Sequence, residues 1–230
     1  MNKLPFLKGS RKSEVLEIIH SDVCGPIRVE SNEKARYVVT FIDDHSWCEI
    51  RLLKRKDEVL DAFKDFKASA ENQHGRKIQF LQSDNGKKYR NGVFDTFLRE
   101  VGIRRRTSVT HTPEQNGVAE RRNRTLMEMT RCFLIQSSLP LSFWGEAINT
   151  ANYIRNRYSS RSLEGRTSYE KWTGKVPNVS YFKEFGIQIF TLNRQPTKEK
   201  LTSRSKKRIF VGYIRMKRRD IEYGCRTRGE

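Results

Sequence analysis

Three carboxylates have the local context and the spacing that metal-dependent chemistry requires. Asp22 and Asp84 each close a short apolar segment that reads as a β-strand, and open α/β sheets bind ligands at the carboxyl ends of their strands. Glu120 lies in the first turn of a long helical stretch, with 35 residues between it and Asp84. Converging carboxylates repel one another unless a divalent cation neutralises them, and hard oxygen ligands select Mg²⁺ or Mn²⁺. On spacing alone, ordinary turn and helix-start carboxylates are the alternative.

The helical stretch around Glu120 has one polar face. At about 100° per residue, Arg124 and Arg131 share the face of Glu120, and the apolar side chains lie opposite. Two helix starts fit the sequence, a capping box over residues 112–115 and an N-cap at Asn116. With either start, Glu120 points away from the core, beside arginines that can hold a phosphate backbone.

The elements that must position these residues alternate in the order βββαβαβαα, which predicts an α/β fold with helices packed on the faces of one sheet. We expect strands over residues 15–22, 36–44, 48–54, 77–84 and 103–109. We expect helices over residues 57–73, 94–101, 117–136 and 140–157. After residue 176, short strand-like segments separated by Pro and Lys/Arg clusters predict a small β module.

Positive charge is concentrated in the last third of the chain. The 230 residues include 46 Lys and Arg and 27 Asp and Glu, a net charge of +19. Residues 1–150 carry 26 basic and 20 acidic side chains, and residues 151–230 carry 20 and 7. Such a polycation attracts phosphate backbones through counterion release, so we favour nucleic acid as the partner over an anionic membrane. A basic surface that only aids solubility is the alternative.

The composition also excludes several classes of protein. A hydrophobic fraction of 36% is enough for a core, and the longest apolar runs are far shorter than the roughly 18 residues of a membrane span. The cysteines lie far apart and lack zinc spacing, so we expect reduced thiols, packed as small core residues in an intracellular protein, with neither disulfides nor structural zinc.

Several motifs are similar to the catalytic core of integrases from copia-type LTR retrotransposons. The motifs are HSDVCGP (20–26), FIDDHS (41–46), SDNG (83–86), HTPEQNGVAERRNRT (111–125), LPLSFWGEAINTANYIRNR (139–157), YEKWTGKVPNVS (169–180) and KKRIFVGY (206–213). The resemblance covers residues 12–214. It implies a ribonuclease H-like mixed sheet with helices on both faces, followed by a small β-rich SH3-like module.

The resemblance also implies a division of the chain. We expect residues 1–12 to be an N-terminal extension that lacks the zinc module of the family, and residues 13–176 to form the catalytic core. Residues 177–230 would form a basic SH3-like module, which we expect to be incomplete because the sequence after Tyr213 departs from the family pattern.

The site implied by the resemblance is a triad of Asp22, Asp84 and Glu120, acting as catalytic residues and as ligands of two Mg²⁺ or Mn²⁺ ions. Its implied partners are the double-stranded DNA of the element ends and of the target, bound by a homo-oligomer assembled on DNA, with no membrane. The implied location is the nucleus, reached from the cytoplasm. The DNA-binding residues that we predict are Asn116, Arg121, Arg124, Arg131, Lys198, Lys200, Arg204, Lys206, Lys207 and Arg208.

One departure from the family concerns the loop after Asp84. The family pattern DNGGEY reads DNGKKY here, so that Lys87 and Lys88 stand beside the predicted metal site. A catalytically inactive DNA-binding remnant of a retrotransposon polyprotein is therefore an alternative to a Mg²⁺-dependent DNA-joining enzyme. A nuclease acting on RNA:DNA hybrids is a third hypothesis, and the segment 111–125 does not fit it.

Four other residues are weaker candidates for chemistry. His20 is compatible with orienting a metal ligand or with packing inside a strand. Asp43 and Asp44 lie at a hairpin turn, which favours a structural hydrogen-bonding role. Trp144 is expected in the core.

Overall fold

The computed structural model describes residues 14–44, 46–83, 89, 92–107, 117–160, 163–192, 205–213 and 223–226. Its strands are β1 (Ile18–Cys24), β2 (Tyr37–Asp43), β3 (Cys48–Leu53), β4 (Phe80–Ser83), β5 (Arg104–Thr107), β6 (Gln188–Leu192), β7 (Ser205–Tyr213) and β8 (Tyr223–Arg226). Its helices are η1 (Lys56–Glu58), α1 (Val59–His74), α2 (Gly92–Glu100), α3 (Gly117–Ser137), η3 (Leu141–Phe143), α4 (Trp144–Arg157) and α5 (Ser168–Thr173). The predicted order βββαβαβαα is confirmed through α4.

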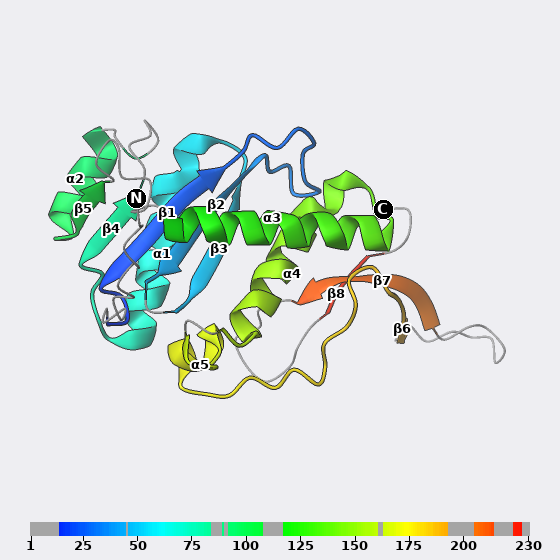
Figure 1. Ribbon diagram of the computed structural model, residues 1–230. Coiled ribbons are helices and arrows are strands. Elements are labelled where there is room, and N and C mark those ends of the chain that lie inside the picture. The colour runs from blue at the N-terminus through cyan, green and yellow to red at the C-terminus, as the bar shows by residue number, and fades with distance from the viewer. Residues whose placement is uncertain are drawn as a thin grey trace, which may run out of the picture.

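Five strands form one mixed sheet in the order β3-β2-β1-β4-β5 (Figure 1). The pairs β1–β2 and β2–β3 are antiparallel, whereas β4 runs parallel to β1 and to β5. In the antiparallel meander, residues 25–36 join β1 to β2 and residues 44–47 join β2 to β3, whereas each parallel connection includes a helix, as parallel pairing requires. The carboxyl ends of β1 and β4 therefore lie at the same edge of the sheet.

Helices cover both faces of this sheet, as predicted. Side chains alternate along a strand, so Val39 and Phe41 of β2 enter the core formed with α1 and α2, where Phe41 stacks on Phe66 at 5.0 Å. Val38 and Ile42 enter the second core, formed with α3 and α4. β2 is buried on both faces, which explains its nearly continuous apolar sequence.

α4 packs beside β3, which is an edge strand of the sheet. Asn156 accepts a hydrogen bond from the backbone N–H of Cys48 (3.3 Å) and donates one to its carbonyl (2.7 Å), and Asn152 donates to the same carbonyl (3.0 Å). These amides satisfy backbone groups of β3 that would otherwise be open to pairing with another strand. Trp144 at the start of α4 is buried and donates to the Val29 carbonyl (2.9 Å), which confirms its expected place in the core.

A second, antiparallel sheet has the order β6-β7-β8 and packs against α4. Phe185 and Val211 contribute to the same core as α3 and α4. The backbone of β7 comes so close to α4 that a Cβ on Gly212, whose φ is +143°, would lie 2.6 Å from Thr150 Oγ1. The described part of the basic tail thus shares a core with α3 and α4, and its SH3-like form stays a prediction.

The structure differs from the predicted elements at several ends. β1 begins at Ile18 and not at Val15, because residues 14–17 form a turn in which Leu16 has a φ of 67° and donates to Asp43 Oδ1 (2.8 Å). α4 begins after the 3₁₀ turn η3. α5 is not among the predicted helices, although Thr167 and Glu170 form a complete capping box at its start. In the described part of the chain, no helix is both long and apolar enough to cross a membrane.

Candidate active site

Asp22 lies within β1 and not at its end, because Val23 and Cys24 continue the pairing with β2. Strand alternation directs the side chains of residues 20, 22 and 24 to the face that α3 covers, and those of residues 19, 21 and 23 to the face of α1 and α2. The Asp22 carboxylate is half-buried, and its Oδ1 accepts a hydrogen bond from the N–H of Val23 (2.8 Å). Its acceptor oxygens therefore lie between the sheet and α3.

The helix that carries Glu120 is attached directly to Asp22. Asn123, which is buried on α3, donates a hydrogen bond from Nδ2 to Asp22 Oδ2 (3.0 Å). Glu120 precedes Asn123 by three residues, which is slightly less than one helical turn. Asn123 is not among the site residues predicted from the sequence. An amide among arginines on the buried side of the helix was the available signal.

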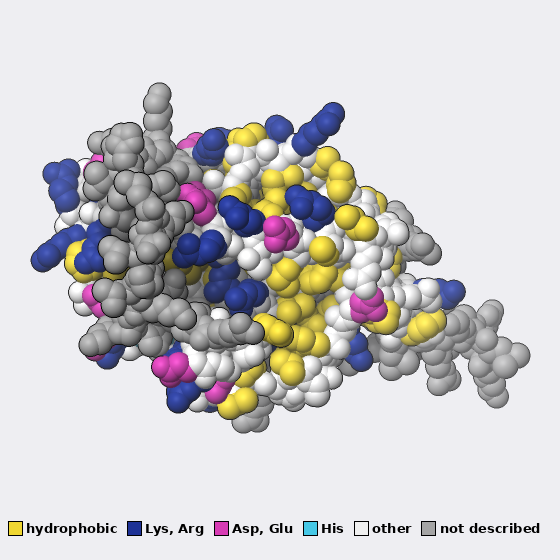
Figure 2. Space-filling model, in the orientation of Figure 1, with side chains coloured by type: hydrophobic (Ala, Val, Ile, Leu, Met, Phe, Trp, Pro, Cys, Tyr) yellow, Lys and Arg dark blue, Asp and Glu magenta, His cyan; other side chains and the backbone are white. Residues whose placement is uncertain are grey.

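Glu120 itself is exposed on α3, as predicted. Arg121, Arg124 and Arg131 are also exposed, whereas Leu126 is fully buried. Figure 2 looks onto this face and shows basic side chains gathered along α3, with an acidic side chain among them. The predicted polar face of the helix is therefore present.

Asp84 lies outside the described residues, but its two described neighbours along the chain both contact Ser21. Ser83 is the register partner of Ser21 in the parallel β1–β4 pair. The Tyr89 hydroxyl, fully buried, lies 2.5 Å from Ser21 Oγ. Ser83 and Tyr89, the described residues on either side of positions 84–88, thus both lie beside the residue that precedes Asp22.

The donor chemistry of this region suits a hard divalent cation, since Asp22 and Glu120 offer carboxylate oxygens on adjacent elements. Within the described ranges, which omit Asp84, no three His, Cys, Asp or Glu side chains converge as a metal site would require. Asn116 also lies outside the described residues.

The basic residues predicted on the tail are only partly described. Lys206 and Lys207 are exposed on β7, and Arg208 is half-buried, with its Nε donating to Thr191 Oγ1 (3.3 Å). The other predicted DNA-binding residues of the tail, Lys198, Lys200 and Arg204, lie outside the described residues.

The weaker candidates are resolved by their contacts. Asp43 is buried and accepts from the N–H groups of Leu16 (2.8 Å) and Ser46 (3.1 Å), which confirms its structural role. His20 Nε2 lies 3.1 Å from Asp44 Oδ1, so the histidine packs against the hairpin turn. The expectation that the cysteines are core residues holds for Cys48, which is buried.

The same expectation is wrong for Cys132, which is exposed because it lies on the polar side of α3, one residue after Arg131.

The class of protein to which this fold belongs is the integrase core domain. Residues 12–113 match the family described as integrase core domain. This match spans β1 to β5 and ends before α3, so it includes positions 22 and 84 and stops short of Glu120.

Curated relatives extend the similarity over nearly the whole chain. The Retrovirus-related Pol polyprotein from transposon TNT 1-94 of Nicotiana tabacum is 42% identical over 94% of this chain, and that from transposon RE2 of Arabidopsis thaliana is 36% identical over 92%. The chain spans only 16% and 14% of these relatives. The Ty1-DR4 Gag-Pol polyprotein of Saccharomyces cerevisiae is 32% identical over 83% of the chain and 12% of its own length. The chain is an integrase core domain of the retrotransposon Pol polyprotein family.

Solved structures share the fold at low sequence identity. The HTLV-2 integrase catalytic core domain in complex with magnesium, in its trimeric form, has a TM-score of 0.52 and 19% identity, covering 68% of this chain and 96% of that chain. The simian T-cell lymphotropic virus intasome in complex with PP2A regulatory subunit B56 gamma has a TM-score of 0.56 and 15% identity, covering 90% and 75%. The ribonuclease H-like fold of the integrase core is thus present here.

Proposed function

We propose that the chain is the catalytic core of a polynucleotidyl transferase that joins the DNA ends of a retrotransposon to target DNA. The observation that carries the proposal is the hydrogen bond from Asn123 to Asp22, which fixes the helix of Glu120 against β1. The contacts of Ser83 and Tyr89 with Ser21, the neighbour of Asp22, support the same site. Sequence identity to Pol polyproteins over 94% of the chain supports the reaction class.

Asp22, Asp84 and Glu120 are the residues that would hold two Mg²⁺ or Mn²⁺ ions. When bound, such ions offset negative charge on the phosphate and on the attacking and leaving oxygens of an in-line displacement. Asn123 keeps the Asp22 carboxylate oriented toward α3. Arg124 and Arg131, on the face of Glu120, would hold the phosphates of the element DNA end.

The remaining predicted DNA-binding residues would position DNA without reading its bases. These are Asn116 and Arg121 near the start of α3, and the tail residues Lys198, Lys200, Arg204, Lys206, Lys207 and Arg208. The protein would act on DNA as a homo-oligomer in the nucleus. The structural neighbours include a core domain described as trimeric and an intasome, which supports this assembly.

The test is strand transfer of a labelled duplex carrying the terminal sequence of the parent element into plasmid DNA, with Mg²⁺ or Mn²⁺. Glu120→Gln should lower joining at least about 100-fold, since metal coordination contributes several kcal/mol to the transition state. Glu128→Gln is the matched control, because it removes the same charge from an exposed position of α3. Equal joining by both variants and the wild type would show that Glu120 has no role in the reaction.

The second candidate is a DNA-binding remnant without chemistry, and the cations Lys87 and Lys88 next to Asp84 favour it. A remnant should bind duplex DNA with the same salt dependence as an active core. Its DNA binding should not change when Mg²⁺ is added. Absence of joining in wild type and Glu120→Gln alike, with DNA binding intact, would support the remnant.

A further inference from the structure

A small pocket lies between the first turns of α3, the end of α4 and the turn between β2 and β3. Its cavity volume is about 250 Å³, which exceeds the roughly 30 Å³ that one water molecule occupies. Three arginines line it, Arg121 and Arg122 from α3 and Arg155 from α4. Asp22 and Glu120 do not line this pocket.

Three buried hydrogen-bond donors around the pocket are unsatisfied. Among the described residues, Nη1 of Arg122, Nη1 of Arg155 and the hydroxyl of Ser46 have no hydrogen-bond partner. A buried donor without a partner destabilises a protein, and a charged donor does so more strongly. Three such groups, all on residues that line one cavity, favour the binding of an acceptor within reach of them.

The charges around the pocket point to the same conclusion. Burial lowers the pKa of Arg155, and the neighbouring positive charge of Arg122 lowers it further. An arginine stays protonated in proteins, so the two guanidinium groups repel each other across a half-buried site. No carboxylate of the described residues forms an ion pair with either of them.

The two aspartates on the pocket wall already have other partners. Asp43 accepts from the N–H groups of Leu16 and Ser46, and Asp44 contacts His20. Both carboxylates are therefore already engaged by the backbone or by the histidine.

We propose that this pocket binds a single phosphate oxyanion, held by Arg122 and Arg155 with Arg121 at the rim. Guanidinium groups bind phosphate oxygens in pairs of parallel hydrogen bonds, and one oxyanion would satisfy donors from two helices at once. The hydroxyl group of Ser168 on the same wall offers a further donor, whereas the Thr125 hydroxyl already donates to the Arg121 carbonyl (3.0 Å). The site is independent of the proposed triad, because none of its contacts involves Asp22 or Glu120.

Inorganic phosphate is the probe for the first experiment. At constant ionic strength, phosphate should raise the melting temperature of the wild type over chloride and bind at one saturable site by calorimetry. Arg155→Gln should be more stable than the wild type without phosphate, since the repulsion from Arg122 is removed, and should lose the phosphate response. Arg155→Lys keeps the charge but not the planar fork and should bind phosphate at least about fivefold more weakly.

Arg99→Gln is the control, because Arg99 is exposed on α2 and, among the described residues, its side chain bonds to Thr96 alone (3.2 Å). It should respond to phosphate as the wild type does. An equal response of the wild type, Arg155→Gln and Arg155→Lys would overturn the proposal. Glu120→Gln should keep phosphate binding even though it loses DNA joining, so failure of this site and failure of the proposed function give different results.

The salt dependence of DNA binding identifies the source of the phosphate. Log affinity for DNA falls with log salt concentration, and each phosphodiester contact makes this slope steeper by about 0.9. If DNA supplies the phosphate, Arg155→Gln should make that slope shallower by about 1. Inorganic phosphate should then compete with DNA for the pocket. If the pocket takes free phosphate, the variant should lose phosphate binding and keep the wild-type slope.

Discussion

At the residue scale, the amide of Asn123 connects two parts of the chain that are 101 residues apart. Its Nδ2 donates to a carboxylate, and hydrogen bonds to charged groups contribute about 1.5–3 kcal/mol. Because the bond fixes Asp22 and the helix of Glu120 together, we consider Asn123 a positioning residue for the proposed site.

Asn123→Ala should destabilise the protein by about 1–3 kcal/mol and raise the Mg²⁺ concentration needed for half-maximal joining. The second effect is the specific one, because the Asp22 carboxylate would lose its orientation toward α3. Urea denaturation measures the first change and a Mg²⁺ titration of strand transfer the second.

Thr130→Ala is the matched control for this prediction. Thr130 is equally buried on α3 and bonds only within the helix, to the Leu126 carbonyl (2.7 Å). It should cost stability without moving the Mg²⁺ midpoint. A midpoint that is the same in Asn123→Ala and in Thr130→Ala would assign Asn123 a purely structural role.

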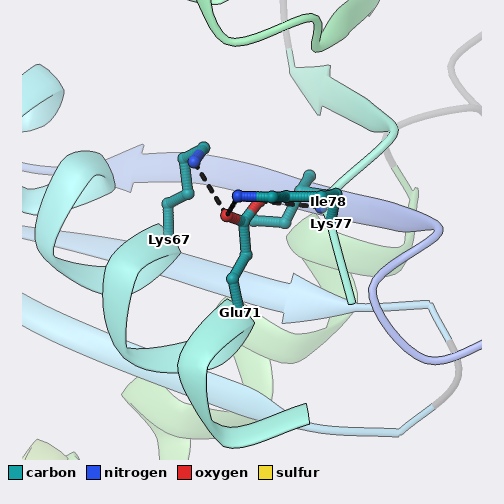
Figure 3. A network of polar contacts seen from close by, with 4 residues as sticks. All are labelled: Lys67, Glu71, Lys77 and Ile78. Atoms are coloured by element: carbon teal, nitrogen blue, oxygen red, sulfur yellow. Dashed lines mark hydrogen bonds and ion pairs between the residues drawn. The ribbon is translucent and has the colours of Figure 1, made fainter. Parts of the chain in front are cut away.

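At the scale of the elements, Glu71 connects the end of α1 to the segment that enters β4. The carboxylate is buried and accepts hydrogen bonds from Lys67 Nζ (2.8 Å), Lys77 Nζ (3.2 Å) and the backbone N–H of Ile78 (3.0 Å), as Figure 3 shows. Burial raises the pKa of Glu71, but these hydrogen bonds lower it more, so the net direction is below its ordinary value.

This direction sets the pH dependence of the contribution from Glu71. A carboxyl group whose pKa is lower in the folded state stabilises the protein above its unfolded pKa, and the contribution is lost as pH falls through the folded pKa. Glu71→Gln should therefore lower the free energy of unfolding by about 2 kcal/mol at pH 7. The difference from the wild type should shrink as the pH falls below the ordinary carboxyl range.

Urea denaturation between pH 7 and pH 3 checks this prediction. Asp61→Asn is the control, because Asp61 forms an exposed pair with Lys64 on the same helix (3.2 Å), and exposed pairs contribute little. A Glu71→Gln difference that stays constant over the whole range would mean that its ionisation does not contribute to stability.

The elements that could be predicted from the sequence are those with a strong local pattern. β2 is almost entirely apolar, and α3 has a clear polar face, so both were found. The start of β1 could not be found, because the turn at Leu16 depends on a hydrogen bond to Asp43, 27 residues away. α5 has only six residues, which is too short for a periodic pattern to be distinctive.

At the scale of the whole molecule, the candidate site was predictable only in part. Asp22 and Glu120 were identified from their motifs, and the helical wheel placed Glu120 correctly on the exposed face. The role of Asn123 depends on the docking of α3 on β1. The closeness of Arg122 to Arg155 depends on how α3 and α4 pack. Such contacts arise from tertiary packing, which a local sequence pattern does not encode.

The charge distribution of the whole chain leads to the last prediction, which concerns Lys206 and Lys207 on β7. Both side chains are exposed, and the pairing of β7 with β6 uses backbone groups, so glutamine at both positions leaves the strand intact. If each lysine contacts a DNA phosphate, the slope of log affinity against log salt concentration should be shallower by roughly 1 to 2 in the double variant. The loss should be similar for unrelated DNA sequences, since backbone contacts carry no sequence information.

The control for this prediction is the double variant Lys64→Gln, Arg99→Gln, measured with the same labelled duplexes by fluorescence anisotropy across a salt series. It removes two exposed charges from α1 and α2, which cover the face of the sheet away from α3. Because these side chains would face away from bound DNA, the control should keep the wild-type slope. Equal slopes in both double variants would mean that the positive field of the chain attracts DNA without phosphate contacts at β7, since the two variants have the same net charge.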